Sequence, residues 1–274
     1  MEIIVMEDGE GITIELDKGQ IVDWGVFSIG AEQEWAKTRG VGVKVAILDT
    51  GSTDHPDVLA NIGKAVGAAD TAGHGSHVAG IIGALDNGIG VVGVAPGCTL
   101  HCYQVLPGNV DSLMTALTQA ADDGADVINM SLGGYPDGDI PELHAVVKAV
   151  YDRGVVLVAA AGNDPTRVSV PAIYPEVIAV SALNEDGSLA VFAPQTQNHV
   201  AMPGVSILST WLDSQYARLS GTSQASPMLT GEIALILALY KPKREDVHKT
   251  VSDALTRIEQ STASIWFEPK ANLI

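Results

Sequence analysis

The sequence predicts an α/β protein with a doubly wound, mostly parallel sheet and helices on both of its faces. Short runs rich in β-branched residues alternate with helical patterns along the chain, which is typical of strand-helix-strand units. The runs are apolar almost throughout, as expected of parallel strands that helices cover on both sides. The 274 residues, of which 46% are hydrophobic, are enough for one large core and therefore for one domain.

Five apolar runs are the predicted buried strands: 43–49, 99–106, 127–132, 155–162 and 177–183. Right-handed crossovers place the connecting helices on both faces, and the carboxyl ends of the strands then face the functional crevice. Asp49 ends the first of these runs. We therefore expect its carboxylate at the edge of the sheet where ligands bind.

Helical patterns fill the intervals between the strands. One helix is expected over 112–123, with Asp111 or Ser112 as its N-cap. A second is expected over 141–153, because Pro141 suits the first turn of a helix and a glycine follows the last periodic residue.

The two ends of the chain differ from its centre. Residues 1–20 are acidic and contain glycines, so we interpret them as an N-terminal extension of a single domain over 21–274. Near the other end, 244–259 is expected to form a polar helix, and 261–274 carries no strong signal. The N-terminus has neither a basic start nor a long apolar stretch, so it is not a secretion signal. We expect a cytoplasmic protein, and the alternative is a trimmed secreted form.

The charge balance excludes two classes of partner. Lys and Arg number 15 against 33 Asp and Glu, a formal net charge of -18, which repels phosphate backbones and anionic lipid headgroups. We therefore expect neither a nucleic acid nor a membrane surface as partner. The longest apolar runs are interrupted by polar residues or are too short to cross a bilayer. Cys98 and Cys102, the only cysteines, would lie about 13 Å apart on a strand, too far for a disulfide.

An acid, a base and a hydroxyl occur in three glycine-rich segments, which follow in the order 49–51 (Asp-Thr-Gly), 74–80 (His-Gly-Ser-His-Val-Ala-Gly) and 221–227 (Gly-Thr-Ser-Gln-Ala-Ser-Pro). A serine hydroxyl is a weak nucleophile unless an imidazole takes its proton. Ser223 is therefore the candidate nucleophile, His74 the candidate base, and Asp49 the group that holds the imidazole. The first segment alone also matches an aspartic protease, but that chemistry needs two carboxylates and the chain has no second such segment.

Two further segments complete a resemblance to a known family: 128–134 (Ile-Asn-Met-Ser-Leu-Gly-Gly) and 159–163 (Ala-Ala-Ala-Gly-Asn). The five ordered motifs resemble those of subtilisin-like serine proteases, most closely the intracellular bacterial subtilisins. The resemblance implies the three-layer αβα fold and a serine endopeptidase that works through an acyl-enzyme. It also implies that the Asn163 amide and the Ser223 N–H form an oxyanion hole. The alternative is a catalytically silent relative that still binds peptides.

The resemblance also implies where an extended polypeptide substrate binds. Residues 131–134 would pair with the substrate backbone as a neighbouring strand. Gly134 ends this strand, and the walls of the first pocket would be small or apolar residues: Ser131, Leu132, Gly133, Ala160, Ala161 and Gly162. Asp164 either attracts a basic substrate side chain or is a solvated loop residue.

A glycine-rich segment over 88–93 formally matches a dinucleotide-binding motif, but it does not lie between a strand and a helix, so we reject that interpretation. The resemblance instead implies a tightly bound structural Ca²⁺, which takes six to eight oxygen ligands. The implied ligands are Gln20, Asp57, Leu85, Asn87, Ile89 and Val91. A second, weaker site would use carbonyls of Ala172, Tyr174 and Val177, but His199 stands where it needs an acid, so we do not expect it to be occupied.

Several positions depart from the family or require a choice between two interpretations. His77 lies one helical turn after His74, and we expect a structural histidine rather than a metal ligand. Gln224 stands where the family usually has methionine, which removes an oxidisable sulfur beside the nucleophile. Only 25 positions separate His74 from Asp49, so a surface loop is shorter than usual. The extension over 1–20 is a candidate inhibitory segment, as the intracellular relatives suggest.

Overall fold

The computed structural model describes residues 1–6, 12–14, 16, 19–194 and 200–261, and its centre is a seven-stranded parallel sheet. The strand order is β13-β12-β11-β9-β4-β7-β5, and all neighbouring pairs run parallel. The strands are β4 (Lys44–Asp49), β5 (Ile62–Val66), β7 (Thr99–Gln104), β9 (Val127–Met130), β11 (Val156–Ala160), β12 (Val177–Leu183) and β13 (Val200–Pro203). The predicted fold class and all five predicted strands are confirmed.

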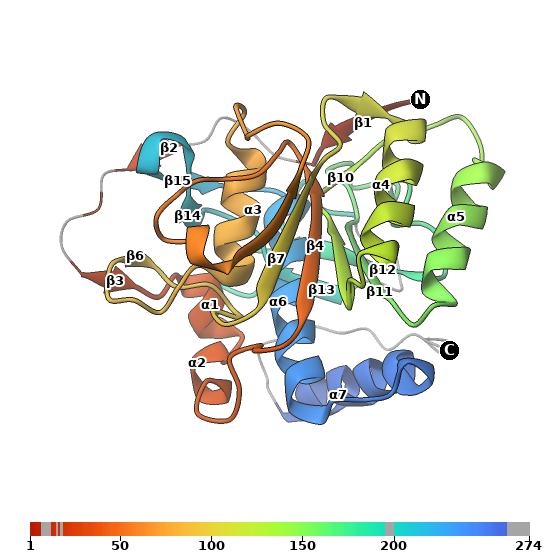
Figure 1. Cartoon of the computed structure of the whole chain (residues 1–274). Helices are drawn as coiled ribbons and strands as arrows, with labels where there is room; N and C mark the ends of the chain where they lie inside the picture. The colour runs from red at the N-terminus through yellow and green to blue at the C-terminus, as the bar shows by residue number, and fades with distance from the viewer. Residues whose placement is uncertain (7–11, 15, 17–18, 195–199, 262–274) are drawn as a thin grey trace.

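Helices cover both faces of this sheet (Figure 1). In β4, Val45 and Ile47 pack in the core under α3 and α6, whereas Ala46 and Leu48 pack in the core under α4 and α5. This double burial explains why the strands are continuous apolar runs. The helices are α1 (Trp24–Ser28), α2 (Ala31–Glu34), α3 (His74–Gly83), α4 (Val110–Asp122), α5 (Pro141–Tyr151), α6 (Thr222–Tyr240) and α7 (Val247–Ser261). Among the described residues, no helix combines the length and the apolar character needed to cross a bilayer.

The predicted N-cap of α4 is wrong. Asn109, not Asp111 or Ser112, caps the helix: its Oδ1 accepts from the main-chain N–H of Asp111 at 3.0 Å and of Ser112 at 3.1 Å. The Ser112 hydroxyl in turn accepts from the Asn109 N–H at 2.9 Å, which completes a capping box. Three neighbouring polar residues could each act as the cap, and the pattern of apolar residues does not distinguish them. The second helix begins at Pro141 as predicted.

The polar helix expected over 244–259 begins later than predicted. A 3₁₀ turn over Arg244–Asp246 comes first, and α7 then runs from Val247 to Ser261. α7 packs against α6 at the end of the molecule away from β1 (Figure 1). Of the segment 261–274, all but Ser261 lies outside the described residues.

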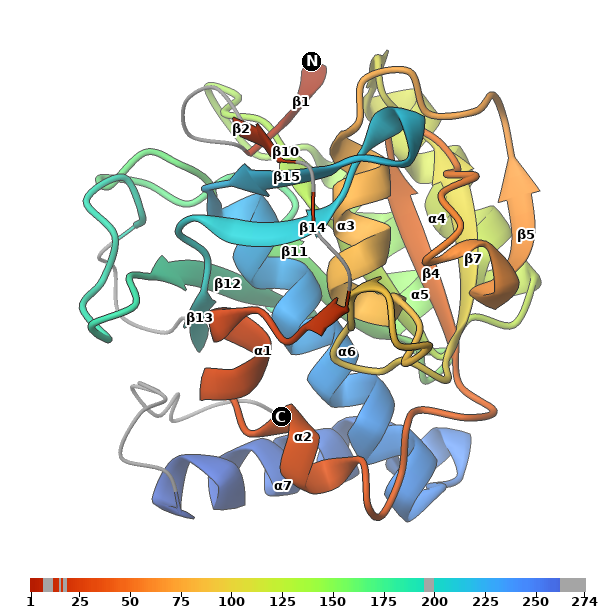
Figure 2. The same ribbon diagram turned by 90° about the vertical axis from the view of Figure 1, so that its left-hand side faces the viewer.

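The described parts of the N-terminal extension add strands to the body of the protein. β1 (Glu2–Val5) runs antiparallel between β8 (Gly108–Asn109) and β10 (Leu132–Gly133). β2 (Ile12–Ile14) joins β15 (Tyr216–Leu219), which pairs with β14 (Ile207–Thr210), as Figure 2 shows. β3 (Gln20–Ile21) pairs with β6 (Gly90–Val91). Since β10 follows β9 directly, β1 lies at the carboxyl end of the central sheet.

Candidate active site

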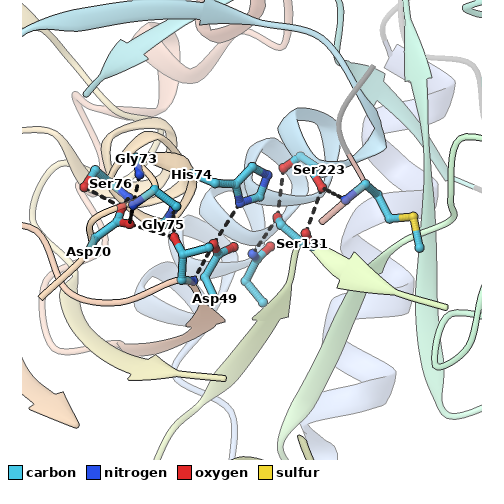
Figure 3. Close-up of polar contacts among 12 residues, drawn as sticks. Asp49, Asp70, Gly73, His74, Gly75, Ser76, Ser131 and Ser223 are labelled. Carbon is cyan, nitrogen blue, oxygen red and sulfur yellow. Dashed lines mark hydrogen bonds and ion pairs between the residues drawn. The ribbon is translucent and has the colours of Figure 1, made fainter. Parts of the chain in front are cut away.

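Asp49 and His74 form a buried acid-base pair. Asp49 is the last residue of β4, and His74 is the first residue of α3. Asp49 Oδ1 lies 2.8 Å from His74 Nδ1 and also accepts from the Thr50 N–H at 2.7 Å. Asp49 is 0% and His74 3% exposed. The carboxylate therefore orients the imidazole, which lies between Asp49 and Ser223 in Figure 3.

A second carboxylate, Asp70, anchors the start of α3. It accepts from the Thr50 hydroxyl at 2.9 Å, from the Gly73 N–H at 2.9 Å, and from both the N–H and the hydroxyl of Ser76 at 2.8 and 2.7 Å. Burial opposes the ionisation of Asp70, but these hydrogen bonds outweigh it and lower the pKa. Asp70 was not among the predicted site residues, although an acidic residue just before a helix is typical of a cap.

We expect replacement of Asp70 by asparagine to destabilise the fold and to change how its stability depends on pH. The lowered pKa means that Asp70 stabilises the fold fully above its usual pKa of 3.8, and that this stabilisation is lost as pH falls through the native value. Asp70→Asn should lower the free energy of unfolding by about 1–3 kcal/mol at neutral pH. Thermal unfolding of both proteins between about pH 6 and pH 2 measures this. A constant difference in Tm across that range would contradict it.

The candidate nucleophile Ser223 lies in the first turn of α6 and is 0% exposed. Its hydroxyl donates to the Ser131 carbonyl oxygen at 2.8 Å and accepts from the Met6 N–H at 2.9 Å. Its main-chain N–H donates to the Met6 carbonyl oxygen at 3.0 Å. Three segments far apart in the sequence therefore meet at this serine (Figure 3).

Asn163 lies beside the same helix start. Its Oδ1 accepts from the main-chain N–H of Thr222 at 3.0 Å and from the Thr222 hydroxyl at 2.9 Å. These bonds fix the amide, so that its Nδ2 points away from Thr222. Nδ2 is buried and has no hydrogen-bond partner among the described residues. A buried amide donor without a partner, next to Ser223, has the chemistry needed to bind a developing oxyanion.

The predicted substrate strand is already paired, and its partner is the N-terminal extension. Ile4 lies opposite Gly133 and Val5 opposite Leu132. A Cβ atom on Gly133 would lie 2.8 Å from Cε of Met6, so the Met6 side chain occupies the space beside this glycine. The other residues predicted to bind substrate, Ser131, Gly134, Ala160, Ala161 and Gly162, are buried.

The extension inserts two side chains into the body of the protein. Ile3 and Met6 are each 2% exposed, whereas Ile4 between them is 47% exposed. Ile3 packs in the core that contains Leu113 and Leu132. This insertion could not be predicted from the sequence. Residues 3–6 are four consecutive apolar residues, so they show no alternation that would distinguish a buried from an exposed face.

Asp164 is paired within its own loop. Its Oδ2 accepts from Arg167 Nε at 2.8 Å, and its Oδ1 accepts from the hydroxyl and the N–H of Thr166 at 2.6 and 3.0 Å. The Thr166 and Arg167 hydrogen bonds lower the pKa of Asp164 to about 2. The Arg167 guanidinium lies 4.3 Å from the centroid of the Tyr135 ring. Asp164 thus carries a charge that a loop cation already balances.

His77 has the surroundings of a structural histidine. Its Nε2 lies 3.1 Å from the Ile207 carbonyl oxygen and 3.0 Å from that of Ala217. Burial lowers the pKa of His77 to about 3, so the ring is neutral and donates to these carbonyls. Within the part of the chain that the structure describes, no three His, Cys, Asp or Glu residues gather as a metal site. His199 lies outside the described residues.

The six residues expected around Ca²⁺ lie together, where β3 meets β6. Gln20 Nε2 donates to the carbonyl oxygens of Leu85 at 2.6 Å and Val91 at 3.2 Å. Asp57 accepts from Asn87 Nδ2 at 3.0 Å and from the Val91 N–H at 2.9 Å. The Ile89 N–H donates to Asn87 Oδ1 at 3.1 Å, which closes the loop. Burial raises the pKa of Asp57, an effect that a bound cation would oppose.

Comparisons with known proteins give relatives for most of the chain. The model of the subtilase family, Peptidase_S8, matches residues 40–264. Subtilisin DY of Bacillus licheniformis is 39% identical over 265 residues, which cover 88% of this chain and 94% of that protein. The intracellular serine protease of Paenibacillus polymyxa is 41% identical, over 78% of this chain and 72% of the relative. The major intracellular serine protease of Bacillus subtilis (strain 168) is 38% identical, over 77% and 74%.

Proposed function

Because the chain belongs to the subtilase family and is a serine endopeptidase, we propose that Ser223, His74, Asp49 and Asn163 carry its chemistry. The observation that supports this most directly is the 2.8 Å contact between Asp49 Oδ1 and His74 Nδ1, with the imidazole turned toward Ser223. This arrangement meets the geometric requirement for a base that is oriented by a buried carboxylate.

The reaction follows from the roles of these groups. The Ser223 hydroxyl exchanges its hydrogen bond to the Ser131 carbonyl for one to His74, which takes the proton as Oγ attacks the peptide carbonyl carbon. The Ser223 N–H and Asn163 Nδ2 bind the resulting oxyanion. His74 then gives the proton to the leaving amine, and an acyl-enzyme remains on Ser223. Water, activated by the same imidazole, hydrolyses this ester and restores the serine.

Labelling with a fluorophosphonate tests this assignment against a peptide-binding protein without turnover. The full chain is expected to become labelled on Ser223 and to hydrolyse a denatured protein substrate. Ser223→Ala should lose both properties and remain folded, with a lower Tm because two buried hydrogen bonds are lost. Labelling at another residue, or hydrolysis by the alanine variant, would refute the role of Ser223. Binding of peptides by the native chain without labelling or hydrolysis would favour the silent alternative.

We also propose that residues 1–6 block the substrate groove of their own chain. The support is that β1 uses the predicted substrate strand, Met6 fills the space beside Gly133, and the Ser223 N–H donates to the Met6 carbonyl. The Ser223 hydroxyl lies between the Met6 N–H, from which it accepts, and the Ser131 carbonyl, to which it donates. The segment therefore occupies the groove and also contacts both the hydroxyl and the main-chain N–H of the candidate nucleophile.

Weakening the binding of residues 1–6 to the groove is expected to raise the apparent affinity for substrate. Burying a large apolar side chain stabilises by about 1.5–3 kcal/mol, so Ile3→Asp together with Met6→Asp should lower KM at least about tenfold. The kcat should stay unchanged, because segment and substrate exclude one another. Steady-state hydrolysis of a peptide substrate measures both constants. Ile4→Asp is the matched control, since Ile4 is 47% exposed on the same strand and its replacement should change neither constant.

We propose a Ca²⁺ ion in the loop formed by Gln20, Asp57, Leu85, Asn87, Ile89 and Val91. The support is the donor set: one carboxylate, two side-chain amides and three main-chain carbonyls, which are the hard oxygens that Ca²⁺ prefers. Gln20 and Asn87 would rotate their amides to present oxygen. The ion would link β3 to β6 and offset the buried charge of Asp57. The second site near Ala172, Tyr174 and Val177 is not proposed, because its acidic ligand is replaced by His199.

Removal of Ca²⁺ is expected to lower the thermal stability. An ion present at about 100 times its Kd stabilises the folded state by about 2.7 kcal/mol, which chelation would remove. Tm with excess chelator should therefore fall by several degrees, and added Ca²⁺ should restore it. Asp57→Asn should have the lower Tm from the start and respond to neither addition. An unchanged Tm, with no ion found by elemental analysis, would refute the site.

The polypeptide substrates follow from the family, and we propose the remaining partners and the location. A net charge of -18 supports the expectation that neither nucleic acid nor a membrane surface is a partner. Similarity to proteins named as intracellular serine proteases supports a cytoplasmic location. Fractionation of cells that produce the chain, with detection by an antibody, tests the location.

A further inference from the structure

The carbonyl oxygen of Ser223 lacks the hydrogen bond that a helix normally provides. In an α-helix, this oxygen accepts the main-chain N–H of the residue four positions later. That residue is Pro227, which lies inside α6 and has no N–H. Ser223 is 0% exposed, so solvent cannot supply a donor. A buried carbonyl without a donor is costly, and the oxygen therefore needs a donor from outside the helix.

The Ser131 side chain supplies this donor. Its hydroxyl donates to the Ser223 carbonyl oxygen at 2.8 Å, while Asn129 Nδ2 donates to Ser131 Oγ at 2.9 Å. The bond from Asn129 occupies a lone pair of Ser131 Oγ and leaves its hydrogen directed at Ser223. Asn129 Oδ1 is held by the hydroxyls of Ser226 and Thr230, both at 2.9 Å. A chain of hydrogen bonds thus runs from the middle of α6, through β9, to the carbonyl of Ser223.

We propose that Ser131, oriented by Asn129, is a positioning residue for the nucleophile. Its hydroxyl takes the place of the helix bond that Pro227 removes and holds the main chain of Ser223, which carries both the attacking oxygen and a donor to the oxyanion. The proposal rests on the role proposed for Ser223. The Ser131 hydroxyl does not touch the reacting atoms; it acts through the Ser223 backbone, where a displacement of about 1 Å can cost up to 100-fold in rate.

A double-mutant cycle with Pro227→Ala tests the proposal in the full chain. Ser131→Ala alone removes the donor and is expected to lower kcat about 10- to 100-fold with KM changed less than about twofold. Pro227→Ala gives the Ser223 carbonyl a main-chain N–H from its own helix. In that background, Ser131→Ala should lower kcat less than about threefold. The proposal is tested on kcat, because residues 1–6 compete with the substrate for the groove and therefore change KM.

A matched control distinguishes a positioning role of Ser131 from the general loss of stability that follows when a buried hydrogen bond is removed. Ser181 is 1% exposed, and its hydroxyl donates to the Pro194 carbonyl at 3.1 Å, so Ser181→Ala loses a similar buried bond elsewhere. It should lower Tm and leave kcat unchanged. If Ser131→Ala does not fold alone, a folded and active double variant supports the proposal, and a folded but inactive one overturns it.

Two other outcomes overturn the proposal: an equal loss of kcat in both backgrounds, or an unchanged kcat in Ser131→Ala. Failure of the unaltered chain to react with a fluorophosphonate would instead refute the role of Ser223 itself. Failure of the proposed function and failure of this inference therefore give different results.

Discussion

Replacing Asp49 by alanine is expected to lower kcat about 10⁴-fold. This magnitude is the one measured when the corresponding aspartate of subtilisin was removed. The physical reason is the 2.8 Å contact with His74 Nδ1. Removing the carboxylate frees the imidazole to turn and takes away the negative charge that stabilises the imidazolium as Ser223 loses its proton. Steady-state kinetics should show the loss in kcat, with KM changed much less.

Asp49→Asn separates the two contributions of this carboxylate. The amide oxygen can keep the bonds from His74 and from the Thr50 N–H, so orientation is largely retained while the charge is lost. We expect this variant to be strongly impaired but more active than the alanine variant. Asp54→Ala, at an exposed position five residues away, serves as the control and should keep full activity. An alanine variant within about tenfold of the native kcat would show that Asp49 is not the orienting acid.

The central sheet could be predicted because its signals are local, and signals of the same kind indicated the candidate catalytic residues. Each predicted strand is buried on both faces, so an apolar run alone indicates it. Asp49 ends such a run, and Ser223 lies in the first turn of the apolar helix α6. The edge strand β5 gave no such signal, because Gly63 and Lys64 interrupt it and its side chains are only half-buried or exposed.

The extension over 1–20 was a candidate inhibitory segment, but its pairing with β10 could not be predicted, because it depends on contacts between distant parts of the chain. β1 pairs with β10 through Ile4 opposite Gly133, which are 129 positions apart in the sequence, and neither strand is longer than four residues. Such short strands exist only where a partner completes the hydrogen bonds. Asp70, Asn129 and Ser131 were missed as positioning groups for a related reason. Buried polar residues acquire their roles from the partners that the fold brings to them.

Residues 1–6 bind to main-chain groups that are also expected to bind substrate, namely β10 and the Ser223 N–H. This suggests how the enzyme could hold a peptide without cleaving it. The Met6 carbonyl accepts from the Ser223 N–H, but Asn163 Nδ2 has no partner among the described residues. A peptide carbonyl bound by one of two donors is less polarised than one bound by both. With the roles proposed above, binding at the groove and activation of the carbonyl would be separable, and Asn163 would be the residue that distinguishes them.

Replacing Asn163 by alanine is accordingly expected to lower kcat about 10²- to 10³-fold, the range measured in subtilisin, with KM almost unchanged. The oxyanion exists only after attack, so loss of the donor destabilises the transition state and not the bound substrate.

Asn163→Asp refines the test: its Oδ1 can still accept from Thr222 at the start of α6, but the side chain can no longer donate. If the donor matters and the helix contact does not, Asn163→Asp loses at least as much kcat as Asn163→Ala. Asn184→Ala, which removes an amide from a loop away from the site, should leave kcat unchanged. Full activity of Asn163→Asp would assign the oxyanion to other donors.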